Sequence, residues 1–361
     1  MRDDRGIDTI ESHTMDWFER LTGFREAGYE DTRRRLVVDG TCLVSTVNGR
    51  RMGIGTLTLP SLAELRDQVR RTRPSPGRLA VRSVVGDVRQ LHRDPALRGA
   101  LFQVASQFNL LEMVGPDVTP EHGVTIYEHD RTQGPACAIA AGAATIYRNH
   151  FVPVPAAGGH PPRTGQTAEH QLDGLADLGA ALAGITGLAA EALWTMRNGY
   201  AMCTLQGLQA IGDALATCGE PKRDELRARL RIGLHRDVEV TDAPLGDTPG
   251  DPMQVSQVFC SALPVAYGRL PRPVWQPLAQ LVLEAAYEAT LQAAVLGASQ
   301  GGSRVVLLTR LGGGAFGNHD AWIDAALRRA LDLHRHHDLD VRLVSYDRAD
   351  ASSLAIERDY A

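Results

Sequence analysis

The stretch GGGAFGN, residues 312–318, follows the apolar run 305–309 (VVLLT) and precedes a helical pattern through Trp322 and Leu327. This order predicts a strand, a glycine-rich loop and a helix. Glycines at such a junction let the backbone approach a ligand closely, and free amides at the start of a helix suit a phosphate group. Many α/β loops use glycine only to turn the chain, so the loop indicates a phosphate site only together with motifs elsewhere in the sequence.

The composition of the 361-residue chain is typical of a globular protein, with 43% hydrophobic and 22% charged residues. Its formal net charge of -5 argues against a broad basic surface for nucleic acid. The five cysteines are dispersed without a CxxC pair, which is typical of reduced thiols in the cytoplasm. Neither a signal peptide nor an apolar window of membrane-spanning length is visible in the sequence. We therefore expect a cytoplasmic protein with no membrane partner.

Residues 1–75 are predicted to form an amino-terminal extension or lobe. Within it, the alternating stretch 43–47 reads as a strand, and Asn48 and Gly49 form a hairpin signal before the stretch 52–57. The segment carries no chemistry of its own, so the sequence favours a scaffold role for it.

Residues 79–361 are predicted to form the core, in which strand patterns alternate with helical patterns. Such alternation is typical of an α/β sheet covered by helices on both faces. Residues 151–225 contain mainly helical patterns and a Pro- and Gly-rich start, so we expect a helical insertion in the core there.

Three short motifs, each after a predicted strand, resemble motifs of the macrodomains, the α/β modules that bind ADP-ribose. Residues 86–89 (GDVR) resemble that family's early Gly-Asp-Ile-Thr motif, and residues 105–109 (ASQFN) resemble its Asn-Ala-Ala-Asn segment. Residues 312–317 resemble its second phosphate loop. The resemblance covers residues 79–150 and about 300–350, and it implies a three-layer α/β/α fold that binds ADP-ribose or an ADP-ribosylated macromolecule.

The resemblance also implies which residues contact the ligand. Asp87 would contact the adenine, Asn109 would lie beside the distal ribose, and the backbone amides of the glycine loop would hold the diphosphate. The implied ligand-binding residues are Asp87, Val88, Ser106, Gln107, Asn109, Gln133, Gly134, Gly312, Gly313, Gly314, Ala315, Phe316, Gly317 and Asn318.

The middle of the chain resembles the poly(ADP-ribose) glycohydrolase-type macrodomains, whose catalytic loop carries Gln-Glu-Glu at a helix start. Here Gln133 and Gly134 stand in that place and no Glu follows them. Hydrolysis of an ADP-ribosyl bond needs a carboxylate that positions or deprotonates water. Glu112, three residues after Asn109, is the preferred candidate, because one helical turn would place both side chains toward one pocket. Glu112 and Asn109 are therefore the predicted catalytic residues. Glu121, Glu128 and Asp130 are further carboxylates near the motifs.

Two other functions remain open at this point. The missing loop Glu favours a non-catalytic module that binds ADP-ribose or an NAD metabolite. Alternatively, Cys137 could act as the thiolate of a cysteine hydrolase, with Gln133 as oxyanion donor and His235 or His150 as base. The histidines near residue 335 are typical of a helix end, so we expect neither a metal nor a cofactor.

Overall fold

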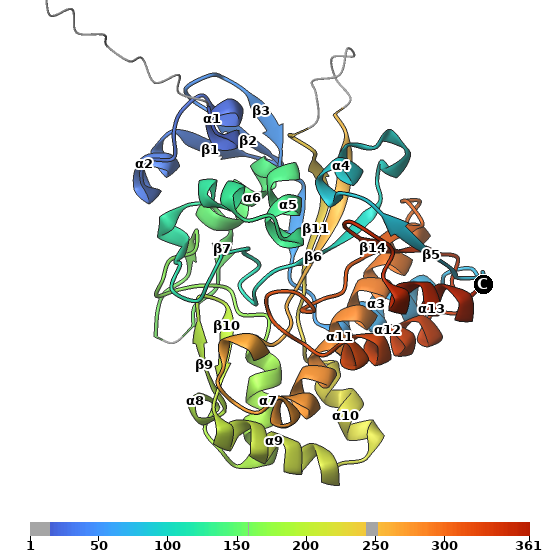
Figure 1. Ribbon diagram of the computed structural model, residues 1–361. Coiled ribbons are helices and arrows are strands. Elements are labelled where there is room, and N and C mark those ends of the chain that lie inside the picture. The colour runs from blue at the N-terminus through green and yellow to red at the C-terminus, as the bar shows by residue number, and fades with distance from the viewer. Residues whose placement is uncertain (1–14, 158, 243–251) are drawn as a thin grey trace, which may run out of the picture.

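The computed structural model describes residues 15–157, 159–242 and 252–361. Its centre is a seven-stranded mixed sheet (Figure 1). In spatial order the strands are β4 (Thr56–Thr58), β11 (Gly233–Glu239), β12 (Gln254–Cys260), β6 (Leu101–Ala105), β13 (Val305–Leu308), β14 (Asp340–Ser345) and β5 (Ala80–Val85).

The strands from β12 to β5 run parallel to one another, whereas β11 pairs antiparallel with both β12 and β4. Parallel strands end at the same edge of a sheet, and ligands of open α/β sheets bind outside that edge. Ala105, Cys260 and Leu308 therefore mark one edge of the sheet, and the segments that follow them lie together.

Helices cover both faces of this sheet, which confirms the predicted α/β/α class. Along β13, Val306 and Leu308 belong to the core on one face and Leu307 to the core on the other, as the two-residue period of a strand requires. The helices of the first face are α3 (Leu62–Thr72), α11 (Arg272–Ser299), α12 (Asp320–Leu333) and α13 (Ala351–Asp359). Those of the second face are α4 (Val88–Arg93), α5 (Gln133–Ala140) and α6 (Gly142–His150).

The amino-terminal lobe sits beside α6 (Figure 1), and its apolar side chains share a third core with residues of the main unit such as Leu111, Ile139 and Ile146. As predicted, Gly49 takes a positive φ of 73° in the turn between two antiparallel strands. The chain then enters the main sheet through β4, and α3 packs along α11, so residues from 56 onward are part of the core and not of the lobe. The lobe contains α1 (Trp17–Thr22), α2 (Tyr29–Arg34), β1 (Leu36–Asp39), β2 (Cys42–Ser45) and β3 (Arg51–Gly53).

From residue 176 onward, the segment predicted as a helical insertion lies at the lower end of the molecule in Figure 1. It also contains a β-hairpin, whose turn is formed by Asn198 and Gly199 with φ of 47° and 79°. Its elements are β7 (Pro153–Val154), β8 (Arg163–Thr164), α7 (Ala176–Thr186), α8 (Ala190–Leu193), β9 (Trp194–Arg197), β10 (Tyr200–Cys203), α9 (Leu205–Thr217) and α10 (Glu220–Arg227).

Four short 3₁₀ helices complete the described chain. They are η1 (Pro95–Leu97), η2 (Pro120–His122), η3 (Thr125–His129) and η4 (Val265–Tyr267). Within the ranges that the structure describes, no helix combines the length and apolar character needed to cross a bilayer.

Candidate active site

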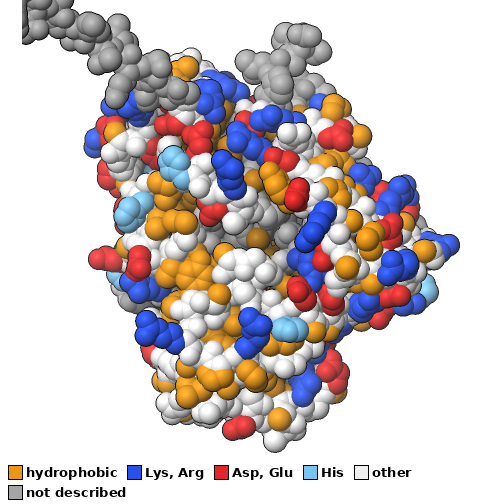
Figure 2. All heavy atoms as spheres, viewed as in Figure 1, with side chains coloured by type: hydrophobic (Ala, Val, Ile, Leu, Met, Phe, Trp, Pro, Cys, Tyr) orange, Lys and Arg blue, Asp and Glu red, His pale blue; other side chains and the backbone are white. Residues whose placement is uncertain are grey.

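A cavity of about 210 Å³ opens at the carboxyl edge of the parallel strands. Figure 2 shows that the middle of the face in view is hollowed. The lining combines the segments after β6 and β13, the start of α5 and the insertion hairpin. The lining residues are Ala105, Ser106, Gln107, Glu112, Met113, Val114, Asp130, Thr132, Gln133, Gly134, Pro135, Tyr200, Ala262, Tyr267, Thr309, Arg310, Leu311, Gly312, Gly314, Ala315 and Phe316.

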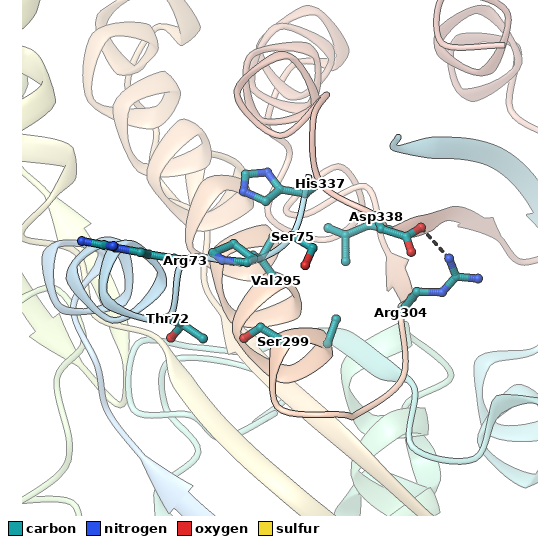
Figure 3. A pocket seen from close by; sticks show the side chains of 11 residues that line it. Thr72, Arg73, Ser75, Val295, Ser299, Arg304, His337 and Asp338 are labelled. Carbon is teal, nitrogen blue, oxygen red and sulfur yellow. Dashed lines mark hydrogen bonds and ion pairs between the residues drawn. The ribbon is translucent and has the colours of Figure 1, made fainter. Parts of the chain in front are cut away.

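A larger cavity of about 410 Å³ lies at the opposite edge, between the ends of α3 and α11 (Figure 3). Among its lining residues, Arg304 and Asp338 pair with each other, shortly before β13 and β14 begin. Because this edge carries the amino ends of the parallel strands and none of the predicted site residues, the smaller cavity is the candidate site.

The glycine loop between β13 and α12 closes on itself and leaves amides free. The N–H of Asn318 donates to the carbonyl of Gly312 (2.9 Å), and Gly317 and Gly314 are bonded in the same way (3.0 Å). Among the described residues, the N–H groups of Gly314, Ala315 and Phe316 have no hydrogen-bond partner. Successive unpaired amides of this kind form a concave site for an anion.

Two glycines of this loop differ in whether a larger residue could replace them. Gly312 has φ of 72°, and a Cβ there would lie 2.4 Å from the Cβ of Ala262. Gly314 has nothing within 4 Å of its Cβ position and no positive φ. We therefore expect Gly312→Ala to lower the free energy of unfolding by about 3 kcal/mol through backbone strain and overpacking. Gly314→Ala should change it by less than about 0.5 kcal/mol. Chemical denaturation of both variants measures the difference, and equal stabilities would contradict this description of the loop.

The free amides belong to the loop and not to the start of α12, which the sequence had suggested as the phosphate site. His319 caps this helix through its Nδ1, and Asp320 in the first turn pairs with Arg310 at 2.8 Å. A carboxylate thus already occupies the positive end of the helix. An anion in the cavity would therefore meet the loop amides.

Three aromatic rings from distant segments meet at the cavity. The ring of Tyr200 lies 5.2 Å from both Tyr267 and Phe316, and the latter two are 5.7 Å apart, measured between ring centroids. Tyr200 comes from the insertion, Tyr267 from η4 and Phe316 from the glycine loop. Such a cluster offers a face on which a planar ligand group can stack.

Gln107 organises the turn that follows β6. Its side-chain amide accepts from the N–H of Met113 (2.8 Å) and donates to the carbonyl of the same residue (3.1 Å). The hydroxyl of Tyr200 donates to that carbonyl as well (2.7 Å). Within this turn Leu110 has φ of 65°, a strained conformation for a residue with a side chain. This turn places Glu112 in the wall of the cavity.

Glu112 is held by two neighbours in a buried cluster. The guanidinium of Arg148 on α6 donates through Nη2 to both carboxylate oxygens, at 3.2 and 3.3 Å. The backbone N–H of Glu112 donates to the hydroxyl of Tyr127 (3.1 Å). Burial raises the pKa of the Glu112 carboxyl to about 7, although Arg148 and Tyr127 act in the opposite direction. A carboxyl group with a pKa near neutrality suits general acid–base chemistry.

Gln133, which resembles the start of the glycohydrolase loop, fastens α5 to the sheet. Its side chain accepts from the N–H of Ala105 (2.8 Å) and donates to the carbonyl of Gln103 (2.8 Å), as a neighbouring strand would. The following Gly134 allows close contact, because a Cβ there would lie 2.1 Å from the oxygen of Ala105 and 3.1 Å from Cγ of Glu112. Both residues line the cavity, and the Gln133 side chain supports the wall instead of facing a ligand.

Asn109, a predicted catalytic and ribose-binding residue, is fully buried and does not line the cavity. Its side chain accepts from the N–H of Leu111 (3.1 Å) and donates to Gln171 (2.8 Å), which in turn donates to Asn198 (2.8 Å). The expected helical turn between Asn109 and Glu112 does not form. Asn109 instead joins the loop after β6 to the hairpin that carries Tyr200.

The remaining predicted residues do not line the cavity. Asp87 caps α4 by accepting from the N–H of Arg89 (2.8 Å), and Val88 is buried against the sheet. Asn318 donates to the carbonyl of Leu263 (2.9 Å) and so holds the glycine loop. The predicted residues outside the lining are Asp87, Val88, Asn109, Gly313, Gly317 and Asn318.

The geometry gives no support to a cysteine nucleophile. Cys137 is fully buried, burial raises the pKa of its thiol, and its Sγ accepts from Gln133 (3.2 Å). His150 pairs with Glu26, and burial lowers the pKa of His235 to about 3. In the described ranges, no group of three or more His, Cys, Asp or Glu side chains is arranged to hold a metal ion.

Sequence reasoning missed several of the residues that shape the cavity. Tyr200 and Tyr267 lie far from the motifs, and Arg148 lies in an Ala-rich helix pattern without a motif. The pair Asn198-Gly199 is a hairpin signal that indicates β9 and β10. No sequence signal shows that this hairpin reaches the cavity.

No protein-family model and no curated protein matches the chain. The chain is similar to solved structures of poly(ADP-ribose) glycohydrolase. One from Deinococcus radiodurans, in complex with ADP-ribose, is 12% identical, with a TM-score of 0.42 over 84% of this chain and 92% of that chain. Another from Thermomonospora curvata, bound to the inhibitor ADP-HPD, is 12% identical, with a TM-score of 0.42 over 92% of this chain and 96% of that chain.

Proposed function

We propose that this protein binds ADP-ribose, or an ADP-ribosyl group on a macromolecule, and hydrolyses the bond to the carried group. The observation that carries the proposal is the cavity itself. It brings the unpartnered amides of residues 314–316, three aromatic rings and the carboxyl group of Glu112 to one edge of the sheet.

Each part of the cavity fits one part of such a ligand. The loop amides suit the diphosphate, and the rings around Tyr200 suit a base or ribose face. A cavity of about 210 Å³ is below the range of roughly 300–1,000 Å³ for most small-molecule pockets. The diphosphate and the distal ribose would therefore fill the cavity, and the adenosine half of the ligand would extend beyond it.

The chemistry that we propose uses Glu112 as a general base. Water attacks the anomeric carbon of the distal ribose while the bond to the carried group breaks. The Glu112 carboxylate takes a proton from the water and then gives it to the leaving atom, so the protein returns to its starting state. Arg148 holds the carboxylate in place.

The test of this function is the release of ADP-ribose from an ADP-ribosylated protein incubated with the purified chain. We expect release with the unaltered protein and the same rate with Cys137→Ala, because the buried thiol takes no part. Loss of release in Cys137→Ala, with the fold intact, would favour the cysteine hydrolase instead.

A non-catalytic module is the second candidate, and the burial of Glu112 favours it. The residue is 2% exposed and its carboxylate is paired with Arg148, so it also fits a structural ion pair. Binding of ADP-ribose without release from any ADP-ribosylated protein would establish this second function.

The unpaired cysteines fit a reducing compartment, so the proposed targets are cytoplasmic macromolecules.

The proposed role of Glu112 predicts the pH dependence of the reaction. Burial raises the pKa of this carboxyl to about 7, and a general base acts in its ionised form. We therefore expect kcat/KM to rise with pH and to level off above about pH 7. A profile that is flat from pH 5 to 9, or that falls through this range, would contradict the role of general base.

A further inference from the structure

A single carboxylate of the amino-terminal lobe accepts hydrogen bonds from two different parts of the core. Oε2 of Glu26 accepts from the N–H of Val124, the N–H of Thr125 and the hydroxyl of Thr125, each at 2.7 Å. Its Oε1 lies 2.9 Å from Nε2 of His150. The side chains of Glu26 and His150 are 4% and 0% exposed. Glu26 is thus a buried and fully partnered carboxylate, which is unusual for a surface lobe.

The backbone near this carboxylate has no room for a side chain. Gly123 has φ of 80°, and a Cβ there would lie 2.4 Å from Cδ and Oε2 of Glu26. Glycine is therefore required at this position both for its conformation and for the close approach. The loop is shaped around the carboxylate.

The two segments of the core that Glu26 contacts, η3 and α6, are the segments that hold Glu112. Val124 and Thr125 begin η3, which carries Tyr127, and the hydroxyl of Tyr127 accepts from the N–H of Glu112. His150 ends α6, which carries Arg148, the ion-pair partner of Glu112. The same loop continues from η3 to Asp130 and Thr132 in the cavity wall.

We propose that Glu26 is a positioning residue for the candidate active site, through which the amino-terminal lobe fixes η3 and α6 in the arrangement that holds Glu112. This inference rests on the proposed function. It gives residues 15–55 a role in turnover, where the sequence had indicated only a scaffold.

The position of Glu26 requires a side chain that can accept several hydrogen bonds. Glu26→Ala leaves two backbone N–H groups and a hydroxyl without their acceptor, which is costly in a buried place. Glu26→Gln keeps one oxygen for the three donors and turns its NH₂ group toward His150, whose ring nitrogen can accept in its other tautomer. The glutamine variant should therefore preserve the arrangement.

The test measures amide hydrogen exchange of the loop, ADP-ribose affinity and release of ADP-ribose from an ADP-ribosylated protein. We expect Glu26→Ala to raise exchange at residues 124–130 and to lower kcat more than tenfold, with the dissociation constant for ADP-ribose within threefold of the unaltered value. Glu26→Gln should restore kcat to within threefold. Glu30→Ala is the matched control, because its carboxylate is exposed and lies 3.8 Å from Arg33 on the same lobe.

Unchanged exchange and unchanged kcat in Glu26→Ala would overturn the proposal, as would an equal loss of kcat in Glu26→Gln. If Glu26→Ala does not fold, Thr125→Val removes one donor and should still raise exchange at the loop with a smaller loss of kcat; no change in either would overturn the proposal. If the unaltered protein neither binds nor releases ADP-ribose, the proposed function fails, and the exchange data alone decide whether Glu26 orders the loop.

Discussion

Glu112→Gln is expected to lower the release of ADP-ribose about 10³-fold, within the usual contribution of a general base. Glutamine has the shape of glutamate and cannot take up a proton at the pH of the reaction. Since the side chain lies in the cavity wall and is fully buried, the affinity for ADP-ribose should change by less than threefold. Single-turnover release and equilibrium binding on the same preparation measure the two effects.

This variant needs a control for folding, because it leaves the charge of Arg148 buried without its partner. Breaking a buried ion pair from one side costs about 3–5 kcal/mol, whereas replacing both members is often nearly neutral. Glu112→Gln combined with Arg148→Met should regain stability without regaining turnover. Glu121→Gln in η2 and Glu128→Gln in η3, which change two exposed carboxylates, should keep full turnover. Full turnover in Glu112→Gln would place the catalytic group elsewhere.

Gly314→Glu is expected to weaken ADP-ribose binding about 100-fold, which corresponds to about 2.7 kcal/mol. The new carboxylate would stand beside the free amides that are proposed to hold the diphosphate. Two like charges about 4 Å apart near a protein surface repel each other by several kcal/mol, and solvent reduces this value. The fold should be unaffected, because nothing lies within 4 Å of the added Cβ.

Gly184→Glu is the matched control for this second prediction. Gly184 is an exposed residue of α7 with open space around its Cβ position, and it does not line the cavity. The variant Gly184→Glu adds the same charge away from the cavity, and it should bind ADP-ribose as tightly as the unaltered protein does. Equal affinities in Gly314→Glu and Gly184→Glu, measured by competition or thermal shift, would exclude the loop as the diphosphate site.

The sequence predicts those features that depend on local pattern. The alternation of strands and helices predicts the covered sheet, and Asn48-Gly49 predicts its hairpin. Residues that follow strand ends, such as Ser106 and Gln107, line the cavity because parallel strands end at one edge. Gly314 lines it because the loop after β13 reaches the same edge.

The sequence does not predict contacts between distant segments. Glu112 lies in the cavity wall after a turn held by the bonds between Gln107 and Met113, and not on a helical turn after Asn109. Tyr200 reaches the cavity from an insertion about ninety residues after β6. The ion pair of Glu112 with Arg148 spans 36 residues, and no periodicity marks it. Such partners are set by tertiary packing, for which local propensity carries no signal.

Calorimetric titration of the unaltered protein with ADP-ribose tests the central claim most directly, with AMP as the comparison ligand. If the loop amides and the aromatic rings form one site, ADP-ribose should bind with a stoichiometry of one and at least tenfold more tightly than AMP, which lacks the diphosphate and the distal ribose. The absence of both heat and thermal stabilisation at millimolar ADP-ribose would contradict the proposed function.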